Sequence, residues 1–334
     1  MATGSRLSIV LLGLIVLGAP PAAAGGSGRS AAARVGVTTL TFTKTSVSDG
    51  APRPLATVVW YPAVPRTGTA EALGLRDAAI RRGRFPLIVF SHGTCGRPTE
   101  ASYLTMGLAS RGFVVAAPPH PGNTAEEFPG CISATAAVDA FRNRVPDVRF
   151  VVDSLLAETA DPSSRFAHRL RPDAIGISGL SFGGLTALLA AQQEPRLRAV
   201  LALVPGGTAL LDPADITLPT MVIGAQRDQV VGFAESAQAY QRLAGPRLLV
   251  ELLAANHLSV VDDCFNHDLG VSFCVPDDIP QDAAHGLVLH YALPFFRRYL
   301  ANKQDAVHQL VRSVPGVRLE AEPRRRPSSA RVRR

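Results

Sequence analysis

Residues 179–183 read Gly-Leu-Ser-Phe-Gly, a Gly-x-Ser-x-Gly motif between an apolar run ending at residue 177 and a helix-like segment starting at Phe182. At a strand-to-helix junction this motif makes a sharp turn that exposes the serine hydroxyl. The two glycines are needed because side chains there would crowd the turn. Ser178 lacks the second glycine at the matching offset. The pattern therefore predicts that Ser181 is a nucleophile.

A serine hydroxyl becomes a good nucleophile when a neighbouring histidine takes its proton. Proteins with this turn carry the serine, then the acid, then the histidine along the chain. That order excludes His92, His120 and His168, and leaves His257, His267, His285, His290 and His308. His257 alone directly follows an apolar run, at 248–253, and is therefore the predicted base.

The predicted acid, which must orient that imidazole, is Asp228. It follows the apolar run 221–223 and precedes a helix-like segment. Asp212 and Asp215, after the preceding run, are its rivals.

The negative oxygen that forms during acyl transfer needs two N–H donors. The residue after the nucleophile, Phe182, supplies one in proteins with this turn. The loop at 91–96 supplies the other, at Thr94 or at the neighbouring Cys95.

Short apolar runs alternate with helix-like segments through most of the chain, which indicates βαβ units and a mostly parallel sheet. Predicted strands cover 34–42, 55–60, 86–90, 113–117, 174–177, 199–204, 221–223 and 248–253. Predicted helices cover 101–111, 148–158, 182–192, 233–243 and 284–300. Right-handed crossovers put helices on both faces of such a sheet. The fold class is α/β, and we expect one domain from residue 30 to 313.

Both ends of the chain differ from this domain. Residues 1–24 contain Arg6, an apolar run at 7–18 and Ala-Ala-Ala at 22–24, the pattern of a cleaved export signal. The apolar run is short for a membrane anchor. Seven arginines and two glutamates give residues 318–334 a charge of +5 out of the total +7. We expect residues 314–334 to be a disordered basic tail, and the nearly neutral domain gives no support for a nucleic-acid partner.

Four cysteines in an exported chain suggest two disulfides, for which three pairings exist. Cys95 and Cys131 each follow a predicted strand, and Cys264 and Cys274 share one loop-like segment, so we expect the pairs Cys95–Cys131 and Cys264–Cys274.

Residues 248–296 carry no Lys or Arg but seven acidic residues: Glu251, Asp262, Asp263, Asp268, Asp277, Asp278 and Asp282. The simplest interpretation is a solvated loop. A second is an acidic rim near His257, which would disfavour anionic substrates. A third is a calcium site, although the spacing of the carboxylates is not that of an EF-hand. No metal, ATP or nicotinamide motif is present, so no cofactor is expected.

Several segments resemble the secreted bacterial group called predicted dienelactone hydrolases. They are Val-Val-Trp-Tyr-Pro at 58–62, Phe-Ser-His-Gly at 90–93, Pro-His-Pro-Gly-Asn-Thr at 119–124 and Gly-Leu-Ser-Phe-Gly-Gly at 179–184. That group is similar to platelet-activating-factor acetylhydrolases and, more distantly, to cutinase-like polyester hydrolases. True dienelactone hydrolases use a cysteine where this chain has Ser181. The acetylhydrolases take their acid after the earlier strand, so Asp228 follows the polyester-hydrolase pattern.

The resemblance, over about residues 35–300, implies an α/β-hydrolase fold and a carboxylic-ester hydrolase. Its triad would be Ser181, Asp228 and His257, with Thr94 and Phe182 as oxyanion donors. We expect a secreted enzyme that acts on short or medium acyl esters, with lipid and polymeric esters as alternatives. A peptidase or acyltransferase on the same scaffold is the next alternative, and a non-catalytic exported binding protein is the alternative outside enzymes.

Overall fold

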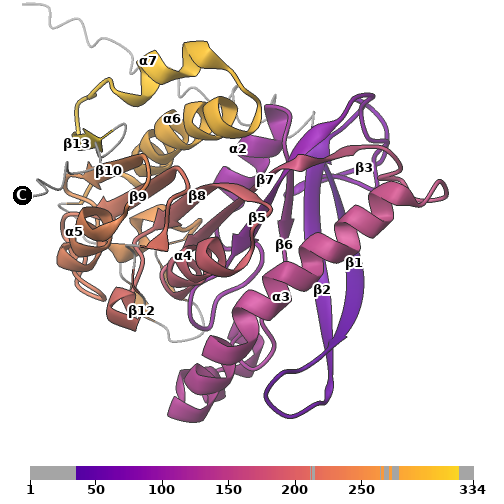
Figure 1. Cartoon of the computed structure of the whole chain (residues 1–334), viewed down its shortest axis with the longest axis horizontal. Helices are drawn as coiled ribbons and strands as arrows, with labels where there is room; N and C mark the ends of the chain where they lie inside the picture. Colours follow the sequence, from indigo (N-terminus) through magenta and orange to yellow (C-terminus); the bar gives the residue numbers. More distant parts are fainter. Residues whose placement is uncertain are drawn as a thin grey trace, which may run out of the picture.

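The computed structural model describes residues 35–210, 212, 215–263, 265–266, 271–272 and 278–322. The proposed export signal at 1–24 and the second cysteine pair lie outside these residues. One sheet of eleven strands runs through the molecule in the order β13-β10-β9-β8-β7-β5-β6-β2-β1-β4-β3 (Figure 1).

The middle of the sheet is parallel and buried on both faces. It consists of β5 (Phe85–Ser91), β6 (Val114–Ala117), β7 (Leu170–Leu180), β8 (Leu197–Leu203), β9 (Thr220–Ala225) and β10 (Arg247–Leu252). The long strands β1 (Val35–Thr45) and β2 (Pro52–Pro62) form an antiparallel hairpin against β6. Continuous apolar runs are typical of parallel strands because helices cover both of their faces.

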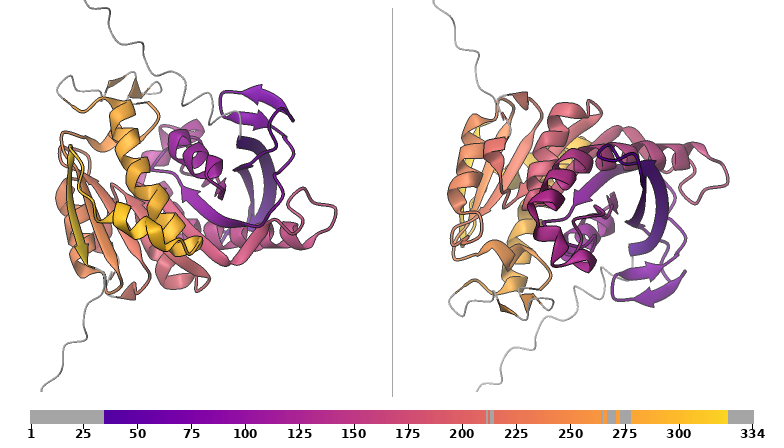
Figure 2. Two further views of the ribbon diagram at one scale, coloured as in Figure 1. Left: turned by 90° about the horizontal axis from the view of Figure 1, so that it is seen from above. Right: turned by 90° about the horizontal axis from the view of Figure 1, so that it is seen from below.

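Helices cover the sheet in two layers, which Figure 2 shows from above and below. One layer contains α2 (Ser102–Ser110) and α6 (Gln281–Leu300), and their apolar side chains form one core cluster with the sheet. The other contains α3 (Ala134–Ala160), α4 (Phe182–Gln193) and α5 (Phe233–Arg242), which form the second cluster. The expected α/β-hydrolase fold is confirmed.

Some elements lie where the sequence pattern gave no strand or helix. β3 (Thr69–Glu71) and β4 (Gly74–Arg76) extend the sheet beyond β1, and α3 begins fourteen residues before the predicted helix at 148–158. At the other edge, β13 (Val317–Glu322) pairs antiparallel with β10. The sheet therefore extends past residue 313, into the segment expected to be a disordered tail. Two short elements, η2 (Gly130–Ile132) and η5 (His257–Val260), lie before α3 and after β10, and α7 (Val307–Leu310) follows α6.

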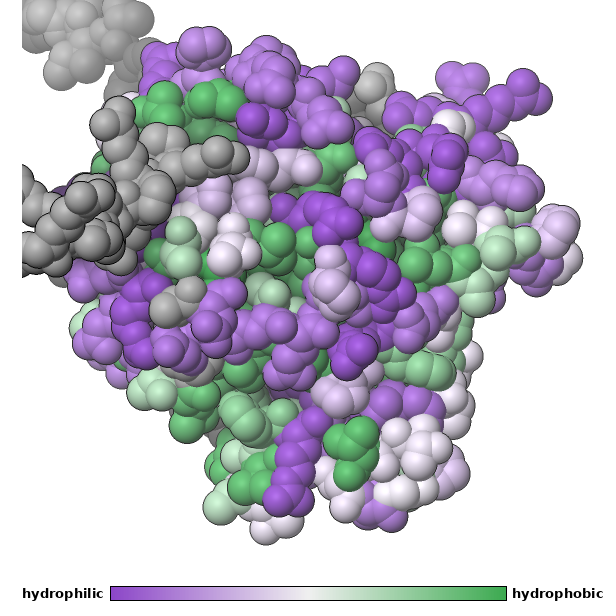
Figure 3. Space-filling model, viewed as in Figure 1, coloured by the Kyte–Doolittle hydropathy of each residue, from purple (hydrophilic) through white to green (hydrophobic). Residues whose placement is uncertain are grey.

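The surface is mostly hydrophilic on the face shown in Figure 3, with apolar side chains scattered among polar ones. Within the described ranges, no helix combines the length and the apolar character that crossing a membrane requires.

Candidate active site

Ser181 lies at the turn between β7 and α4, as the motif predicts. Its backbone has φ 55° and ψ −119°, a conformation that costs a non-glycine residue on the order of 1–3 kcal/mol. Hydrogen bonds hold it there: its N–H donates to the Leu203 carbonyl at 2.9 Å, and its carbonyl accepts from the Leu185 N–H at 3.1 Å. The turn is therefore fixed by β8 and by the first turn of α4.

The glycines around Ser181 are required by close backbone approach. A Cβ atom at Gly179 would overlap the Gly183 carbonyl, and a Cβ atom at Gly183 would overlap the Ser91 carbonyl at the end of β5. The register of β5 and β7 pairs Ser91 with Gly179. The turn and the loop after β5 therefore lie side by side.

Asp228 and His257 form a buried pair after the neighbouring parallel strands β9 and β10. His257 Nδ1 lies 2.7 Å from Asp228 Oδ2, and the two side chains are 7% and 2% exposed. Asp228 Oδ1 accepts from the N–H groups of Val230 and Val231 at 2.9 and 3.0 Å. The structure thus brings together the predicted base and the predicted acid.

The charge state of Asp228 follows from these contacts. Burial by itself would raise the pKa of Asp228, but the hydrogen bond and charge of His257 and the N–H groups of Val231 and Val230 outweigh it, so this pKa lies below its usual value. An ionised carboxylate only accepts hydrogen bonds. The His257 Nδ1 atom therefore carries a proton, and Nε2 is left free to accept one.

Asn256 fixes the short helix η5 that carries His257. Its side-chain oxygen accepts from the N–H groups of Leu258 and Ser259 at 2.8 and 3.1 Å, and its amide donates to Asp278 at 2.6 Å. The Arg227 N–H donates to the Ala255 carbonyl at 2.8 Å, which ties the loop of Asp228 to the loop of His257.

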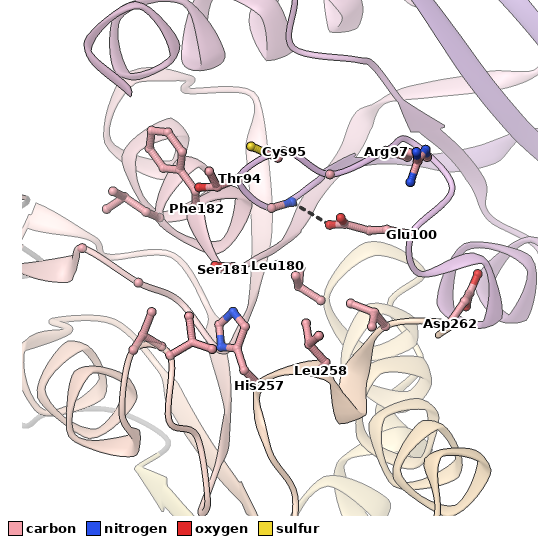
Figure 4. A pocket seen from close by; sticks show the side chains of 18 of the residues that line it. Thr94, Cys95, Arg97, Glu100, Leu180, Ser181, Phe182, His257, Leu258 and Asp262 are labelled. Carbon is pink, nitrogen blue, oxygen red and sulfur yellow. Dashed lines mark hydrogen bonds between the residues drawn. The ribbon is translucent and has the colours of Figure 1, made fainter. Parts of the chain in front are cut away.

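A cavity of about 620 Å³ opens in front of Ser181 at the carboxyl ends of the parallel strands, where ligands bind in such sheets. Apolar side chains of Leu180, Phe182, Leu185, Leu210, Val230 and Leu258 line much of it. Figure 4 shows Ser181 and the ring of His257 facing the same space, with Glu100, Arg97 and Asp262 on another side.

Thr94, Cys95 and Phe182 also line this cavity. Their backbone N–H groups donate to no acceptor in the part of the chain that the structure describes. They are thus available as donors to a bound molecule, and the geometry does not separate Thr94 from Cys95.

Arg144 of α3 is a buried cation beneath the loop 91–96. Its guanidinium donates to the carbonyl oxygens of His92 at 2.5 Å and Gly93 at 2.8 Å, and to the Asn123 side chain at 2.6 Å. Burial lowers the pKa of Arg144 to about 9, while the charges of Glu100 and Asp147 oppose that shift. Arg144 therefore stays charged at neutral pH.

A second Ser-His-Asp chain lies wholly inside the protein. Ser91 Oγ is 2.9 Å from His120 Nε2, His120 Nδ1 is 3.0 Å from Asp147, and Asp147 is paired with Arg53. Burial, with the charges of Arg144 and Arg53, keeps the pKa of His120 well below its usual value. No solvent reaches Ser91, which is 0% exposed, so this chain of hydrogen bonds is structural.

Glu100 faces the cavity and also contacts the loop after β5. Its side-chain carboxyl oxygen accepts a hydrogen bond from the Gly93 N–H at 2.6 Å (Figure 4). Burial raises the pKa of Glu100 to about 7, although the Gly93 hydrogen bond and the charge of Arg144 lower it in part. This carboxyl group therefore changes its charge near neutral pH.

The rival acids lie at the surface, and one of the two expected disulfides is present. Asp212 and Asp215, the rival acids, are exposed to solvent. The structure contains the expected disulfide Cys95–Cys131, which joins the loop after β5 to η2. Cys264 and Cys274 lie outside the described residues.

The acidic segment has separate structural contacts where it is described. Asp262 accepts from the N–H groups of Ser102 and Tyr103 at the start of α2, and Glu251 is paired with Arg318. Within the described ranges, no group of three or more acidic, His or Cys side chains could hold a metal ion. Asp268 and Asp277 lie outside those ranges.

Sequence reasoning missed Arg144, Glu100 and Asn256. Arg144 and Glu100 carry no local signal, because a single charged residue in a helix or loop usually lies in solvent. Asn256 stood directly before the predicted base, and an Asn in that position is a common helix cap.

The sheet, the turn at Ser181 and the cavity at the strand ends define the α/β-hydrolase class of fold. The chain belongs to the PET hydrolase-like family, whose model matches residues 78–272. The relation to polyester hydrolases that the sequence led us to expect is thereby confirmed.

Characterised relatives are similar to this chain at low identity. Cutinase est2 of Thermobifida alba is 28% identical over 177 residues, which is 52% of each chain. The platelet-activating factor acetylhydrolase of Canis lupus familiaris is 26% identical over 271 residues, 69% of this chain and 60% of the relative. The chain thus matches about half to three fifths of the length of these relatives.

A solved structure covers more of the chain. The ferulic acid esterase from Streptomyces cinnamoneus aligns with 86% of this chain and 96% of its own, with a TM-score of 0.68 and 25% identity.

Proposed function

We propose that this protein is a carboxylic-ester hydrolase in which Ser181, His257 and Asp228 act as a catalytic triad. The observation that carries the proposal is the buried 2.7 Å contact between His257 and Asp228 at the cavity onto which the strained Ser181 opens. A structural serine would not need a strained backbone, a flanking pair of glycines and a polarised imidazole at the same cavity.

The reaction has two acyl-transfer steps. His257 Nε2 takes the Ser181 hydroxyl proton while the oxygen attacks the ester carbonyl, and Asp228 stabilises the resulting imidazolium. The N–H groups of Thr94 and Phe182 donate hydrogen bonds to the tetrahedral oxyanion and so stabilise its negative charge. His257 then gives its proton to the leaving alcohol. Water, activated by the same histidine, releases the acid from Ser181.

The substrate proposed is a short or medium acyl ester. Apolar side chains suit the acyl or aromatic part of such a molecule, and the carboxyl groups of Glu100 and Asp262 would disfavour a negative charge beside it. The relatives suggest aromatic, phospholipid and polyester esters as the alternatives to test.

We also propose that the protein is exported, with residues 1–24 as the signal. The proposal rests on the sequence pattern of these residues. Sequencing the N-terminus of protein recovered from the culture medium of a producing cell tests it: a mature chain starting near residue 25 is expected, and an intact N-terminus on cell-bound protein would contradict it.

The decisive experiment compares the wild-type protein with Ser181→Ala on nitrophenyl esters from acetate to palmitate. We expect wild-type turnover on the shorter esters and a loss of kcat of about 10⁴-fold or more in the variant. Ser178→Ala is the matched control, because Ser178 is buried in β7 and its hydroxyl has no hydrogen-bond partner among the described residues. Equal inactivity of wild type and Ser181→Ala on every ester would refute the proposal.

The same assay separates the alternatives. Bis(hydroxyethyl) terephthalate, a ferulate ester and an acetylated phospholipid represent the substrates named in the relatives. A preference for palmitate over acetate would indicate a lipase instead of an esterase for short chains.

A further inference from the structure

Arg144 holds the loop after β5 from below. It is 1% exposed and projects from α3. Its two terminal nitrogens donate to the successive carbonyl groups of His92 and Gly93, and one of them also contacts Ser91 Oγ at 3.3 Å. Two parallel donors on one planar group fix orientation as well as distance.

This contact sets the direction of the donors on the opposite side of the loop. In a trans peptide the C=O and the N–H point in opposite directions. The Gly93 carbonyl belongs to the same peptide unit as the Thr94 N–H. Because Arg144 draws that carbonyl inward, the Thr94 N–H points away from Arg144, on the side where Thr94 lines the cavity.

The preceding peptide is held at both ends. Arg144 binds the His92 carbonyl, and Glu100 accepts from the Gly93 N–H of the same unit. His92 adds a further restraint, since its Nδ1 lies 2.8 Å from the Gly93 carbonyl. Two consecutive peptide planes are thereby oriented before any substrate binds.

Arg144 also touches the second proposed donor residue. The centre of its guanidinium lies 4.6 Å from the centroid of the Phe182 ring, a cation–π contact. One side chain therefore contacts the two segments, the loop after β5 and the start of α4, that carry the proposed oxyanion donors.

The positive charge of Arg144 is not cancelled by a direct partner. No ion pair of Arg144 is found among residues 35–210 or the other described ranges, and the nearby Asp147 is already paired with Arg53 and Lys44. A buried charge needs compensation, and the guanidinium of Arg144 receives it from the two loop carbonyl groups and the Asn123 side chain.

From these contacts the geometry points to Arg144 as a positioning residue of the oxyanion hole, which aims the Thr94 N–H at the reacting carbonyl oxygen and holds Phe182 beside it. This inference rests on the proposed ester-hydrolase function. Its effect falls on the transition state, since the ground-state carbonyl carries little charge.

The test is Arg144→Lys, with Arg142→Lys as the matched control because Arg142 is exposed two residues away on the same helix. Lysine keeps the charge but cannot donate to both loop carbonyls with a fixed geometry. We expect kcat on a nitrophenyl ester to fall about 10- to 100-fold with KM changed by less than three-fold, and Arg142→Lys to match the wild type. Unchanged kcat in folded Arg144→Lys would overturn the inference.

The inhibition constant of a boronic acid is a second measurement, and a general loss of stability would not change it. The boronic acid adds to the Ser181 oxygen as a tetrahedral anion and so mimics the transition state. Its inhibition constant should rise in Arg144→Lys by about the factor that kcat falls, and an unchanged constant alongside a lowered kcat would count against positioning.

Two further results keep the inference separate from the proposed function. If Arg144→Lys does not fold, Phe182→Leu takes its place, because leucine keeps the backbone donor but removes the aromatic ring that Arg144 contacts. We expect this variant to lower kcat at least two-fold without raising KM. Any smaller effect on kcat would overturn the inference. If wild-type protein is inactive on all esters, the proposed function itself fails; if it is active and both variants equal it, only the role of Arg144 fails.

Discussion

The carboxylate of Asp228 is held at both oxygens, one by the His257 ring and the other by two backbone N–H groups. Its orientation is therefore independent of the substrate. The same contacts that lower its pKa also fix which nitrogen of His257 carries the proton. In the proposed mechanism, proton transfer from Ser181 depends on which nitrogen that is.

Asp228→Asn tests this dependence. The asparagine side chain can still accept from the N–H groups of Val230 and Val231, but its NH₂ faces His257 Nδ1 and favours the wrong tautomer. We expect kcat to fall about 10⁴-fold with the fold intact, as judged by circular dichroism. Asp212→Asn, a change at the exposed rival acid, should leave kcat unaltered. The reverse result would move the acid to Asp212.

Glu100→Gln tests the raised pKa of the carboxyl group in the cavity. A group whose pKa rises from 4.5 to about 7 on folding contributes stability that is full below pH 4.5 and is lost as the pH rises through 7. Glutamine cannot ionise but still accepts from the Gly93 N–H. The wild type should therefore lose stability relative to the variant as the pH rises from 4.5 to 8. The free energy of unfolding of Glu100→Gln, minus that of the wild type, should be larger at pH 8 than at pH 4.5. Urea titrations at both pH values measure this gain, and a difference that does not change with pH would contradict it.

The sequence predicts individual site residues where a chemical motif and the order of residues along the chain point to the same position. Ser181, Asp228 and His257 follow from a motif, an order and strand ends, and the structure brings the last two into contact. Arg144 could not be found in the same way, because its partners are backbone carbonyl groups fifty residues away and any cation in a helix has the same local pattern.

The turn between β7 and α4 shows how closely the elements approach one another. Gly183 lies within α4, yet its Cα faces the backbone at the end of β5. Another helical glycine, Gly286 of α6, has open space where its Cβ would lie. The two residues allow the same substitution to be compared in opposite surroundings.

Gly183→Ala should therefore lower the free energy of unfolding, and Gly286→Ala should raise it. The first must push α4 away from β5, which we expect to cost about 1–3 kcal/mol of unfolding free energy and to abolish ester hydrolysis. The second should raise the unfolding free energy by about 0.5–1 kcal/mol, because alanine is the better helix former. Chemical denaturation of both variants measures the difference. Equal stabilities would mean that the close approach at Gly183 is not limiting.

The eight predicted strands and five predicted helices are all present. They could be predicted because each contributes buried apolar side chains to one of the two core clusters. Two of the missed strands, β3 and β13, lack a continuous buried apolar run. β3 is fully exposed, and β13 alternates Arg318, Glu320 and Glu322 with smaller apolar residues, so its charges suggested a tail. Only the partner strand β10 makes that segment a strand.

At the scale of the whole molecule, β13 closes one edge of the eleven-stranded sheet (Figure 1). It pairs with β10 over six residues, and its ion pairs Arg247–Glu322 and Arg318–Glu251 neutralise two side chains that β10 buries. β10 in turn leads into the segment that carries His257.

A chain that ends at Val314 tests the role of this edge, against a control that ends at Glu322. Removal of β13 exposes the N–H and C=O groups of β10 and leaves Glu251 and Arg247 buried without their partners. We expect the shorter chain to melt at a lower temperature and to aggregate at concentrations where the control is monodisperse. Light scattering and thermal melting measure both effects. Identical behaviour of the two chains would show that β13 is dispensable.

The disulfide Cys95–Cys131 makes the active-site loop sensitive to the redox history of the protein. Cys95 directly follows Thr94, and the bond ties this residue to a segment 36 residues further along the chain. Closing a loop of that length stabilises a fold by about 2–4 kcal/mol in the usual account. Protein made in a reducing cytosol would therefore differ from oxidised protein in the order of the loop beside Ser181, even where its overall fold is the same. The oxidation state of this one bond has to be established before the rate constants of two preparations are compared.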